Sequence, residues 1–296
     1  MNGSGMITGY YLSDTGQSGF VRGADGSYTT FDAPGSGGTT YALRINETGD
    51  ITGYYLDSES GEHGYVRAAD GTFTTFDVKG AGSTEGWGIN KKGEIAGQYY
   101  YGSGDIACGT LYQCHGFVRT SRGKIKTFDP AGSTNTWAWK INDKGSIVGA
   151  YLDASGTKHG FVRTTDGTIT TFDPPGSMNT NANSINNKGA IAGTYRDAKG
   201  EHLYFRGADG TISSFDLPQE CVSFGVNGLN DKGQIVGFCV DVNYVSHGFV
   251  RRPGGKINIF DPPGSFYTVS RSSDAGEVMG YYRDNADNFH GYLRTR

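Results

Sequence analysis

Residues 51–94 read ITGYYLDSESGEHGYVRAADGTFTTFDVKGAGSTEGWGINKKGE, and residues 147–190 read IVGAYLDASGTKHGFVRTTDGTITTFDPPGSMNTNANSINNKGA. Both segments contain four short elements of the types I-x-G-Y-Y, H-G-F-V-R, T-T-F-D and A-x-x-I-N. Each element is a few residues long with apolar or aromatic side chains at alternating positions, which is the pattern of a β-strand. The sequence therefore predicts an all-β fold built from one repeated four-stranded unit.

The connections predict the order of the strands within each unit. Asn-x-x-Gly, as in residues 46–49, and Asp-Gly, as in residues 70–71, are hairpin turns in which glycine supplies a positive φ. The longest connection, Phe-Asp-x-Pro-Gly-Ser-x-x-Thr, is expected to carry the chain from one unit to the next. The Ile-Asn strand is then the first and innermost, and the Thr-Phe-Asp strand is the fourth and outermost.

Copies of the repeat start near residues 6, 51, 95, 147, 191, 235 and 278. The four elements occur seven, seven, six and six times, which gives 26 strands, because the first and last copies each lack one element. Four-stranded units repeated in this way are typical of β-propeller blades. We predict a single β-propeller domain over residues 1–296 with seven blades, the alternative being six blades and an extra hairpin.

Composition restricts the partners of the chain. It has 49 glycines, 13% aromatic residues and a net charge of −4, with no run of lysine and arginine. We therefore expect no nucleic-acid partner. No apolar stretch reaches the length of a membrane span, so we expect no membrane partner. Residues 1–5 lack the features of a signal peptide, which indicates a cytosolic protein or one that has lost its leader.

The four cysteines bear on the cellular compartment. Cys108 and Cys114 lie six residues apart, and Cys221 and Cys239 lie eighteen apart across a predicted hairpin. Both spacings permit local disulfides, which form in oxidising compartments; four free thiols are the alternative. Neither spacing suits a four-cysteine metal site, and we expect no metal or cofactor. The expected location is extracellular or periplasmic, with the cytoplasm as the alternative.

The consensus HGFVR..DGT.TTFD.PGS..T.A..IN..G.I.GYY resembles the HAF-repeat proteins of bacteria, a family described as extracellular repeat proteins. The resemblance covers about residues 6–295. It implies a bacterial and exported protein. The family has no agreed catalytic residues, so the resemblance transfers none to this chain.

Residues that recur in every copy are assigned to the fold. All six histidines occupy one repeat position, too far apart in a propeller to share a metal. Pairing the hairpin across its Asp-Gly turn brings His63 close to Asp77, so we predict a buried His–Asp hydrogen bond in each blade. The recurring arginine, such as Arg67, is expected to be structural. The tyrosine of Gly-x-Tyr, such as Tyr55, is expected in the core between blades.

Function is sought where the copies differ. The third copy carries an insertion of about eight residues that contains Tyr100, Tyr101 and Tyr112 beside the Cys108–Cys114 pair. Exposed tyrosines on such a loop are suited to ligand binding. A neutral insertion or a cover for a sheet edge is the alternative.

Only three tryptophans occur, Trp87, Trp137 and Trp139, all just before the Ile-Asn element in two neighbouring copies. If that strand is innermost, their side chains face the central channel or its mouth. Clustered indoles on a rigid scaffold suit stacking against sugar rings or aromatic ligands. Packing between blades is the alternative.

The residue before Ile-Asn is cationic in three copies, as Arg44, Lys140 and Arg271. Three cations near the axis could hold a carboxylate such as that of a uronic acid, with Glu85 and Glu220 as possible acidic partners. Solvation of an exposed surface is the alternative.

These features favour a ligand-binding propeller that recognises a glycan, or another small polar or aromatic ligand, at one mouth of the channel. The predicted site is Trp87, Trp137, Trp139, Tyr112, Arg44, Lys140 and Arg271. The alternatives are a polysaccharide-cleaving enzyme and a protein-interaction scaffold. As an enzyme, a lyase on uronic-acid polymers is favoured over a glycosidase, with Tyr100, Tyr101 or Glu85 as catalytic candidates and Asp105 or Glu220 as further carboxylates. We expect a monomer.

Overall fold

Short strands joined by tight turns account for the structure, and the described residues contain no helix. The structure is a computed structural model that describes residues 1–14, 16–102, 113–218, 221–274 and 277–295. The chain divides into two compact units. Unit 1 is residues 1–156 with residues 163–169, and unit 2 is residues 157–162 with residues 170–296. Our prediction of a single domain over residues 1–296 stays a prediction.

Unit 1 contains the strands of the first copies. They are β1 (Ile7–Ser13), β2 (Gly16–Arg22), β3 (Tyr28–Phe31), β4 (Thr39–Ile45), β5 (Ile51–Leu56), β6 (Glu62–Arg67), β7 (Phe73–Phe76), β8 (Ser83–Ile89), β9 (Ile95–Tyr100), β10 (His115–Arg119), β11 (Ile125–Phe128), β12 (Asn135–Ile141) and β13 (Ile147–Leu152).

The remaining strands belong to unit 2, with the ends of the first two shared with unit 1. They are β14 (Lys158–Arg163), β15 (Ile169–Phe172), β16 (Asn179–Ile185), β17 (Ile191–Asp197), β18 (Gly200–Arg206), β19 (Ile212–Phe215), β20 (Cys221–Leu229), β21 (Ile235–Asp241), β22 (Ser246–Arg251), β23 (Ile257–Phe260), β24 (Ser265–Asp274), β25 (Glu277–Asp284) and β26 (Phe289–Arg294). The described residues thus form 26 strands, as the repeat predicts.

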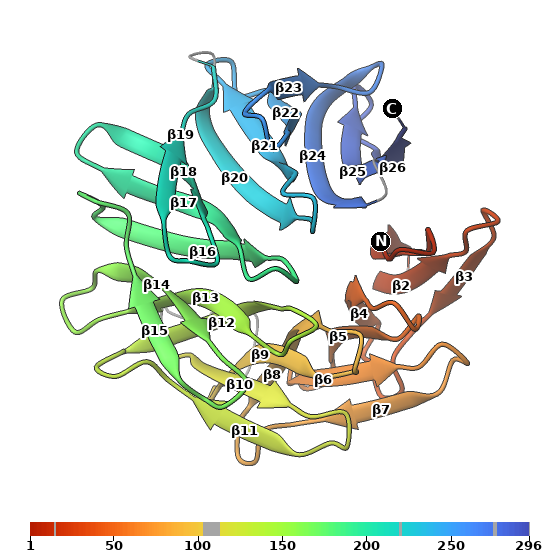
Figure 1. Cartoon of the computed structure of the whole chain (residues 1–296). Coiled ribbons are helices and arrows are strands. Elements are labelled where there is room, and N and C mark those ends of the chain that lie inside the picture. Colours follow the sequence, from red (N-terminus) through yellow and green to blue (C-terminus); the bar gives the residue numbers. More distant parts are fainter. Residues whose placement is uncertain (15, 103–112, 219–220, 275–276, 296) are drawn as a thin grey trace. The chain divides into compact units, whose positions relative to one another are not determined.

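Each complete copy is an antiparallel meander, which β4–β7 illustrate (Figure 1). Ile51 in β5 lies opposite Ile45 in β4 and Arg67 in β6, and β7 pairs with β6 alone. The chain then passes to β8, whose backbone pairs with β6 at one parallel position, Glu62–Ser83. The predicted strand order within a copy is confirmed.

The long connection between copies is closed by a buried threonine. The amide of Ala33 donates to Oγ1 of Thr40 at 3.0 Å, and that of Val78 donates to Oγ1 of Thr84 at 3.1 Å. Both threonines are fully buried. These bonds satisfy backbone amides that no strand partner reaches, which explains why a threonine ends the motif.

The asparagine after each Ile-Asn strand links one copy to the next. Its side-chain oxygen accepts backbone amides of its own turn, as Oδ1 of Asn46 does from Thr48 and Asp50. Its Nδ2 donates to the carbonyl of the equivalent asparagine in the following copy, from Asn46 to Asn90 at 3.1 Å. The same bond joins Asn2 to Asn46 at 2.9 Å and Asn186 to Asn230 at 3.1 Å. Each of these asparagine side chains therefore stabilises its own turn and also binds the backbone of the next copy.

The recurring arginine is structural, as predicted, and its contact also spans two copies. In six copies the guanidinium lies over the Phe of the Phe-Asp element in the preceding copy, a cation–π arrangement. The distances from guanidinium carbon to ring centroid are 4.8 Å for Arg67 over Phe31, 4.9 Å for Arg119 over Phe76, 4.8 Å for Arg163 over Phe128, 4.7 Å for Arg206 over Phe172, 4.2 Å for Arg251 over Phe215 and 4.1 Å for Arg294 over Phe260.

The predicted His–Asp hydrogen bond is present in five copies. The distances from Nδ1 to the nearest carboxylate oxygen are 3.0 Å for His63–Asp77, 2.8 Å for His115–Asp129, 2.6 Å for His159–Asp173, 2.7 Å for His202–Asp216 and 2.6 Å for His247–Asp261. The prediction that the pair is buried is wrong, because the side chains of His63 and Asp77 are 27% and 45% exposed. The outer strand lies at the rim of the sheet, where water reaches the pair.

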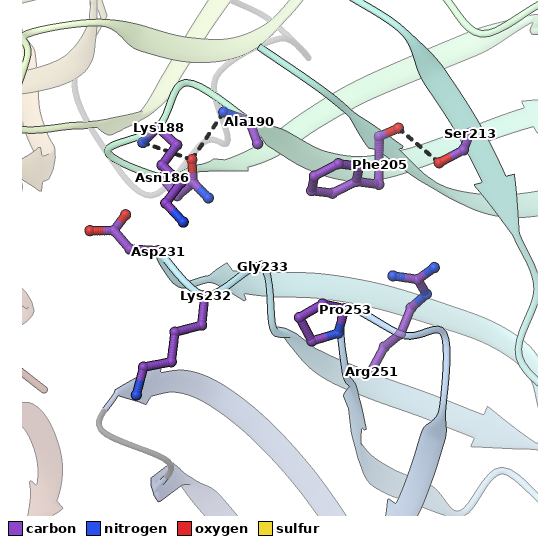
Figure 2. A pocket seen from close by; sticks show the side chains of 10 residues that line it. All are labelled: Asn186, Lys188, Ala190, Phe205, Ser213, Asp231, Lys232, Gly233, Arg251 and Pro253. Carbon is purple, nitrogen blue, oxygen red and sulfur yellow. Dashed lines mark hydrogen bonds between the residues drawn. The ribbon is translucent and has the colours of Figure 1, made fainter.

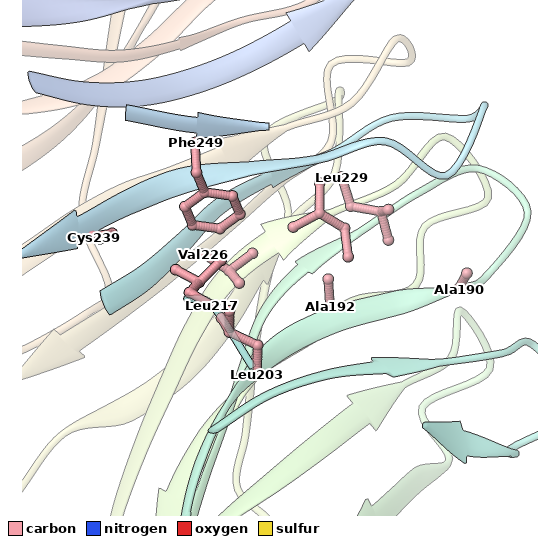
Figure 3. Packing of buried hydrophobic residues seen from close by; sticks show 9 residues of the cluster. Ala190, Ala192, Leu203, Leu217, Val226, Leu229, Cys239 and Phe249 are labelled. Atoms are coloured by element: carbon pink, nitrogen blue, oxygen red, sulfur yellow. The ribbon is translucent and has the colours of Figure 1, made fainter. Parts of the chain in front are cut away.

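Apolar side chains between neighbouring copies form the core. In unit 2, Leu203, Val226 and Phe249 pack together with other buried residues from β17 to β22 (Figure 3). Cys239 belongs to this cluster and forms a disulfide with Cys221, which joins β20 to β21. Of the core tyrosines, Tyr55 is buried as predicted, but Tyr11 is 39% exposed because no described strand precedes its copy.

A membrane-spanning helix is not found among the described residues.

Candidate functional site

Two tryptophans stand at β-bulges on adjacent strands of unit 1. Trp87 is the extra residue between Gly86 and Gly88 in β8, and Trp139 is the extra residue between Ala138 and Lys140 in β12. The strands meet closely here, since a Cβ on Gly88 would lie 3.2 Å from the carbonyl oxygen of Trp139. Both indoles are half-buried. The structure thus brings these two predicted site residues onto neighbouring strands.

A buried carboxyl group holds the indole of Trp87. Nε1 of Trp87 donates to Oε2 of Glu85 at 2.6 Å. Nε2 of Gln98, directly across the strand pair, donates to the same oxygen at 3.1 Å. Glu85 is only 6% exposed and Gln98 only 5%. The ring of Trp87 is therefore fixed by a partner beneath the surface.

A second buried carboxyl group lies against the first. A side-chain hydrogen bond joins Glu62, at the start of β6, to Glu85. The hydroxyl of Tyr100 donates to Oε2 of Glu62 at 2.7 Å. Glu62 and Tyr100 are 6% and 2% exposed. We call the five residues Glu62, Glu85, Trp87, Gln98 and Tyr100 the Glu62–Glu85 cluster.

The electrostatics of this cluster favour a proton shared between the carboxyl groups. Burial, and then the nearby Glu62, raise the pKa of Glu85 to about 8, so the pair of carboxyl groups retains a proton at neutral pH. Oε2 of Glu85 accepts two hydrogen bonds, and a further side-chain hydrogen bond links Glu85 to Glu62. Burial also raises the pKa of Tyr54, and the two carboxyl groups add to this rise. The cluster therefore places two buried carboxyl groups near the side chain of Tyr54.

The tyrosines predicted for the insertion separate into different environments. Tyr100 is buried in the cluster rather than exposed as expected, and burial raises its pKa, which disfavours the phenolate that a catalytic base requires. Tyr101 is 64% exposed and lies edge-on to Tyr99 and His115 at 5.8 and 6.0 Å. Tyr112, Cys108, Asp105 and Glu220 lie outside the described residues. Cys114 is disulfide-bonded.

The three predicted cations do not share one repeat position. Arg44 and Lys140 each follow a bulge, at the position next to Ile45 and Ile141. In β24 the bulge lies between Ser270 and Ser272, so Arg271 is the bulged residue and aligns with Trp87 and Trp139. The prediction that Arg271 matches Arg44 and Lys140 is wrong, because the bulge in β24 lies one residue further from the C-terminal end of its strand than the bulges in β4 and β12 do.

The surroundings of the three cations differ. Nη1 of Arg44 donates to the carbonyl of Leu43 at 2.7 Å. Arg271 is exposed, and its guanidinium lies 5.3 Å from the ring of Tyr281. Arg44 and Lys140 belong to unit 1 and Arg271 to unit 2.

Sequence reasoning did not find Glu62 or Gln98. Glu62 precedes the repeated histidine, where other copies carry Gln17, Cys114, Lys158, Glu201, Ser246 and Phe289. That position is irregular like those of the tryptophans, so the same criterion could have selected it. What the sequence does not show is that β6 meets β8 at this point.

Comparison with known proteins identifies the fold. No family model matches the chain, and no curated protein sequence matches it. Among solved structures, a streptogramin B lyase superposes with a TM-score of 0.60 at 14% identity, over 99% of this chain and 95% of that chain. The β-propeller domain of the Trilobed protease from Pyrococcus furiosus gives a TM-score of 0.65 at 11% identity, over 98% and 91%.

The chain is a β-propeller. TolB from Acinetobacter baumannii is also similar, with a TM-score of 0.55 at 12% identity over 98% of this propeller and 79% of that chain. Identities this low show the fold alone. The four-stranded copies are the blades of this propeller, and its function must be argued from the irregular residues.

Proposed function

We propose that this propeller binds a carbohydrate on the bulged strands β8 and β12, at one mouth of its channel. The observation that carries the proposal is the hydrogen bond of 2.6 Å from Nε1 of Trp87 to the buried Glu85. A half-exposed indole fixed from below is a rigid apolar face, and such faces suit the apolar side of a sugar ring. Trp139 repeats the same bulge position on the adjoining strand.

Neighbouring residues suggest the type of sugar. Trp137 occupies on β12 the register that Glu85 occupies on β8, and it is half-buried. Arg44 and Lys140 are the cations closest in sequence to the bulges of β4 and β12. Guanidinium and ammonium groups bind carboxylates by charge-assisted hydrogen bonds. We therefore propose that sugars bearing a carboxylate bind best.

The experiment is a glycan array followed by titration of the best glycan. Trp87→Ala and Trp139→Ala should each weaken binding by about tenfold or more, which corresponds to about 1.4 kcal/mol. Asn183→Ala is the matched control, because Asn183 occupies the same bulge position on β16 in unit 2. If no glycan binds, or if the tryptophan variants bind as well as the control, the proposal is wrong.

A second candidate function, cleavage of a uronic-acid polymer, is favoured by the Glu62–Glu85 cluster. A carboxyl group that keeps its proton at neutral pH is suited to act as a general acid. Burial of Glu85 and Tyr100 counts against this candidate, since both must reach the sugar to react. Incubation with pectin and alginate, monitored by the absorbance of the unsaturated product, separates the two functions. Product that disappears in Glu85→Gln would support cleavage, whereas binding without product supports recognition alone.

We further propose that the chain is an exported bacterial HAF-repeat protein that acts as a monomer, without nucleic-acid or membrane partners. The Cys221–Cys239 disulfide supports export, because such bonds persist in oxidising compartments. Cell fractionation of the source organism and light scattering on the purified chain test these two points. Recovery from the cytoplasm or a dimeric mass would contradict them.

A further inference from the structure

A groove in unit 2 is lined by none of the residues of the Glu62–Glu85 cluster and by none of the three tryptophans (Figure 2). It has a volume of about 370 Å³ and is lined by the blade β16–β19 and the blade β20–β23. We call it the Arg251 groove. The residues that matter for its chemistry are Lys188, Ala190, Phe205, Ser213, Arg251 and Pro253.

The groove combines apolar walls with positive charge. Figure 2 shows Phe205 and Pro253 on opposite sides of the open space. The guanidinium of Arg251 lies at one end and Lys188 at the other, while the hydroxyl of Ser213 donates to the carbonyl of Phe205 at 3.4 Å. A slot of this kind suits a ligand with a flat apolar body and an anionic end.

The guanidinium of Arg251 keeps donors available for a ligand. In four other copies Nη1 of the equivalent arginine donates to the next carbonyl, as Arg67 does to Ala68 at 3.4 Å. Arg251 makes no such bond within the described residues. Its Nε is buried and unpartnered, as in Arg67, Arg119, Arg163 and Arg206, so the donors left for a ligand are those of the Nη groups. Stacking on Phe215 at 4.2 Å holds the group in place. Its donors are thus oriented but not used by the described residues.

The acid that accompanies this arginine elsewhere is missing here. Four of the hairpin turns after the arginine carry an aspartate, at Asp25, Asp70, Asp166 and Asp209. These carboxylates interact with their own arginines, as Asp70 does with Arg67. The equivalent residue after Arg251 is Gly254, where a side chain would meet nothing within 4 Å. The positive charge of Arg251 is therefore not balanced by an acidic side chain at this position of the turn that follows it.

A second acid of the repeat is also missing. The turn after the Ile-Asn strand ends in Asp50 in one copy and Glu94 in the next, each bonded to its turn asparagine. Ala190 takes this position beside the groove, which removes a carboxylate and opens space. The acid that remains, Asp231, accepts the amide of Asn187 at 2.7 Å and its Nδ2 at 3.1 Å. Its two oxygens are occupied in joining the blades.

We propose that the Arg251 groove binds a small ring carboxylate, with the carboxylate at Arg251 and the ring between Phe205 and Pro253. Guanidinium groups pair with carboxylates through two parallel hydrogen bonds, which fixes the orientation of the ligand. Lys188 adds long-range attraction for the anion. This site is independent of the proposed carbohydrate site, which lies in unit 1.

The test is titration of the full chain with sodium benzoate, followed by amide NMR, against sodium chloride at equal ionic strength. We expect saturable shifts at Gly233 and Gly254 with benzoate only. Gly254→Asp restores the missing carboxylate beside Arg251 and should weaken benzoate binding by about tenfold or more. Gly254→Asn has the same size without the charge and should bind within about twofold of wild type.

Both substitutions suit the site, because Gly254 is exposed and its φ lies outside the left-handed region. Thermal unfolding of the two variants serves as the folding control. Equal weakening by Gly254→Asp and Gly254→Asn, or benzoate shifts no larger than those of chloride, would overturn the proposal. Sodium sulfate that binds as tightly as benzoate would overturn the role assigned to Phe205 and Pro253.

Discussion

Nδ1 of His63 lies 3.0 Å from both carboxylate oxygens of Asp77, and Nε2 of the same ring lies 3.1 Å from Asp57. His202 is held in the same way by Asp216 and Asp197, and His247 by Asp261 and Asp241. Each imidazole thus bridges the hairpin that precedes it and the outer strand that follows it. The bridge is strongest when the imidazole is charged.

The first prediction is that the protein loses stability as the pH rises from about 6 to about 8. Burial opposes the charged form of His63, but the bonds to Asp57 and Asp77 outweigh it and raise its pKa. The pKa of His202 and His247 is also raised. A histidine whose pKa is higher in the folded protein than in the unfolded chain stabilises the fold at pH values below its unfolded pKa. This stabilisation is lost as the pH rises through its folded pKa.

Urea unfolding over this pH range measures the effect. Because the pairs are partly exposed, solvent screens them and the expected pH dependence is shallow. The triple variant His63→Gln, His202→Gln, His247→Gln should show a shallower pH dependence than wild type. A wild-type stability that is constant between these pH values contradicts the prediction.

The second prediction concerns the buried acid Glu85. Its pKa is raised in the folded state to about 8, first by burial and then by Glu62, so the folded protein binds a proton that the unfolded chain releases at lower pH. The free energy of unfolding should therefore decrease as the pH rises from the pKa of Glu85 in the unfolded chain toward about 8, by at most about 1.4 kcal/mol per pH unit.

Glu85→Gln preserves the shape of a protonated carboxyl group and should remove this slope with little loss of stability at neutral pH. Glu85→Ala is the contrasting variant, since it leaves Nε1 of Trp87 and Nε2 of Gln98 without their acceptor. We expect it to cost about 3 kcal/mol. A pH profile of Glu85→Gln identical to that of wild type would show that Glu85 does not titrate in this range.

The third prediction is that Asn90→Ala destabilises the protein by about 3 kcal/mol in chemical denaturation. Oδ1 of Asn90 accepts the amides of Lys92 and Glu94, and Nδ2 donates to the carbonyl of Asn142. Asn243→Ala is the control, because Asn243 is an exposed turn residue. Comparable unfolding midpoints for the two variants would refute a special role for Asn90.

The fourth prediction is that replacing both Cys221 and Cys239 by serine costs about 3 kcal/mol, as expected for a loop of this size. The bond closes a segment of 18 residues and fixes β20 against β21. Cys239 is 1% exposed within the core of unit 2, so its serine also introduces a buried hydroxyl. Denaturant midpoints decide the matter, and a variant as stable as wild type would show that packing alone fixes this hairpin.

The repeat was sufficient to predict the strands, their order within a blade and the His63–Asp77 bond. These features follow from alternation and turn chemistry within one copy, where a hairpin of known length fixes which residues lie opposite each other. The position of Arg271 was not predictable in this way. A bulge shifts the register by one residue, and the serines around it give no signal for where it falls.

The Glu62–Glu85 cluster and the Arg251 groove were missed for a different reason. Both are formed by residues of two neighbouring blades, so their partners are far apart in the sequence. Glu62 and Glu85 are separated by a link whose length says nothing about side-chain contact. The groove owes its positive charge to two substitutions, because Ala190 and Gly254 occupy positions at which other copies carry acidic residues.

Five asparagine bonds between blades run in one direction, from the side chain of one copy to the next copy. The acceptor is a backbone carbonyl for Asn2, Asn46, Asn90 and Asn186, and Oγ of Ser273 for Asn230. The bond from Asn46 to Asn90 spans 44 residues, and that from Asn90 to Asn142 spans 52, because the insertion of the third copy lies between them. A duplicated segment would therefore arrive with its own donor and acceptor already matched to its neighbours. A whole repeat added to or removed from the sequence would thus leave this asparagine contact intact between the copies on either side.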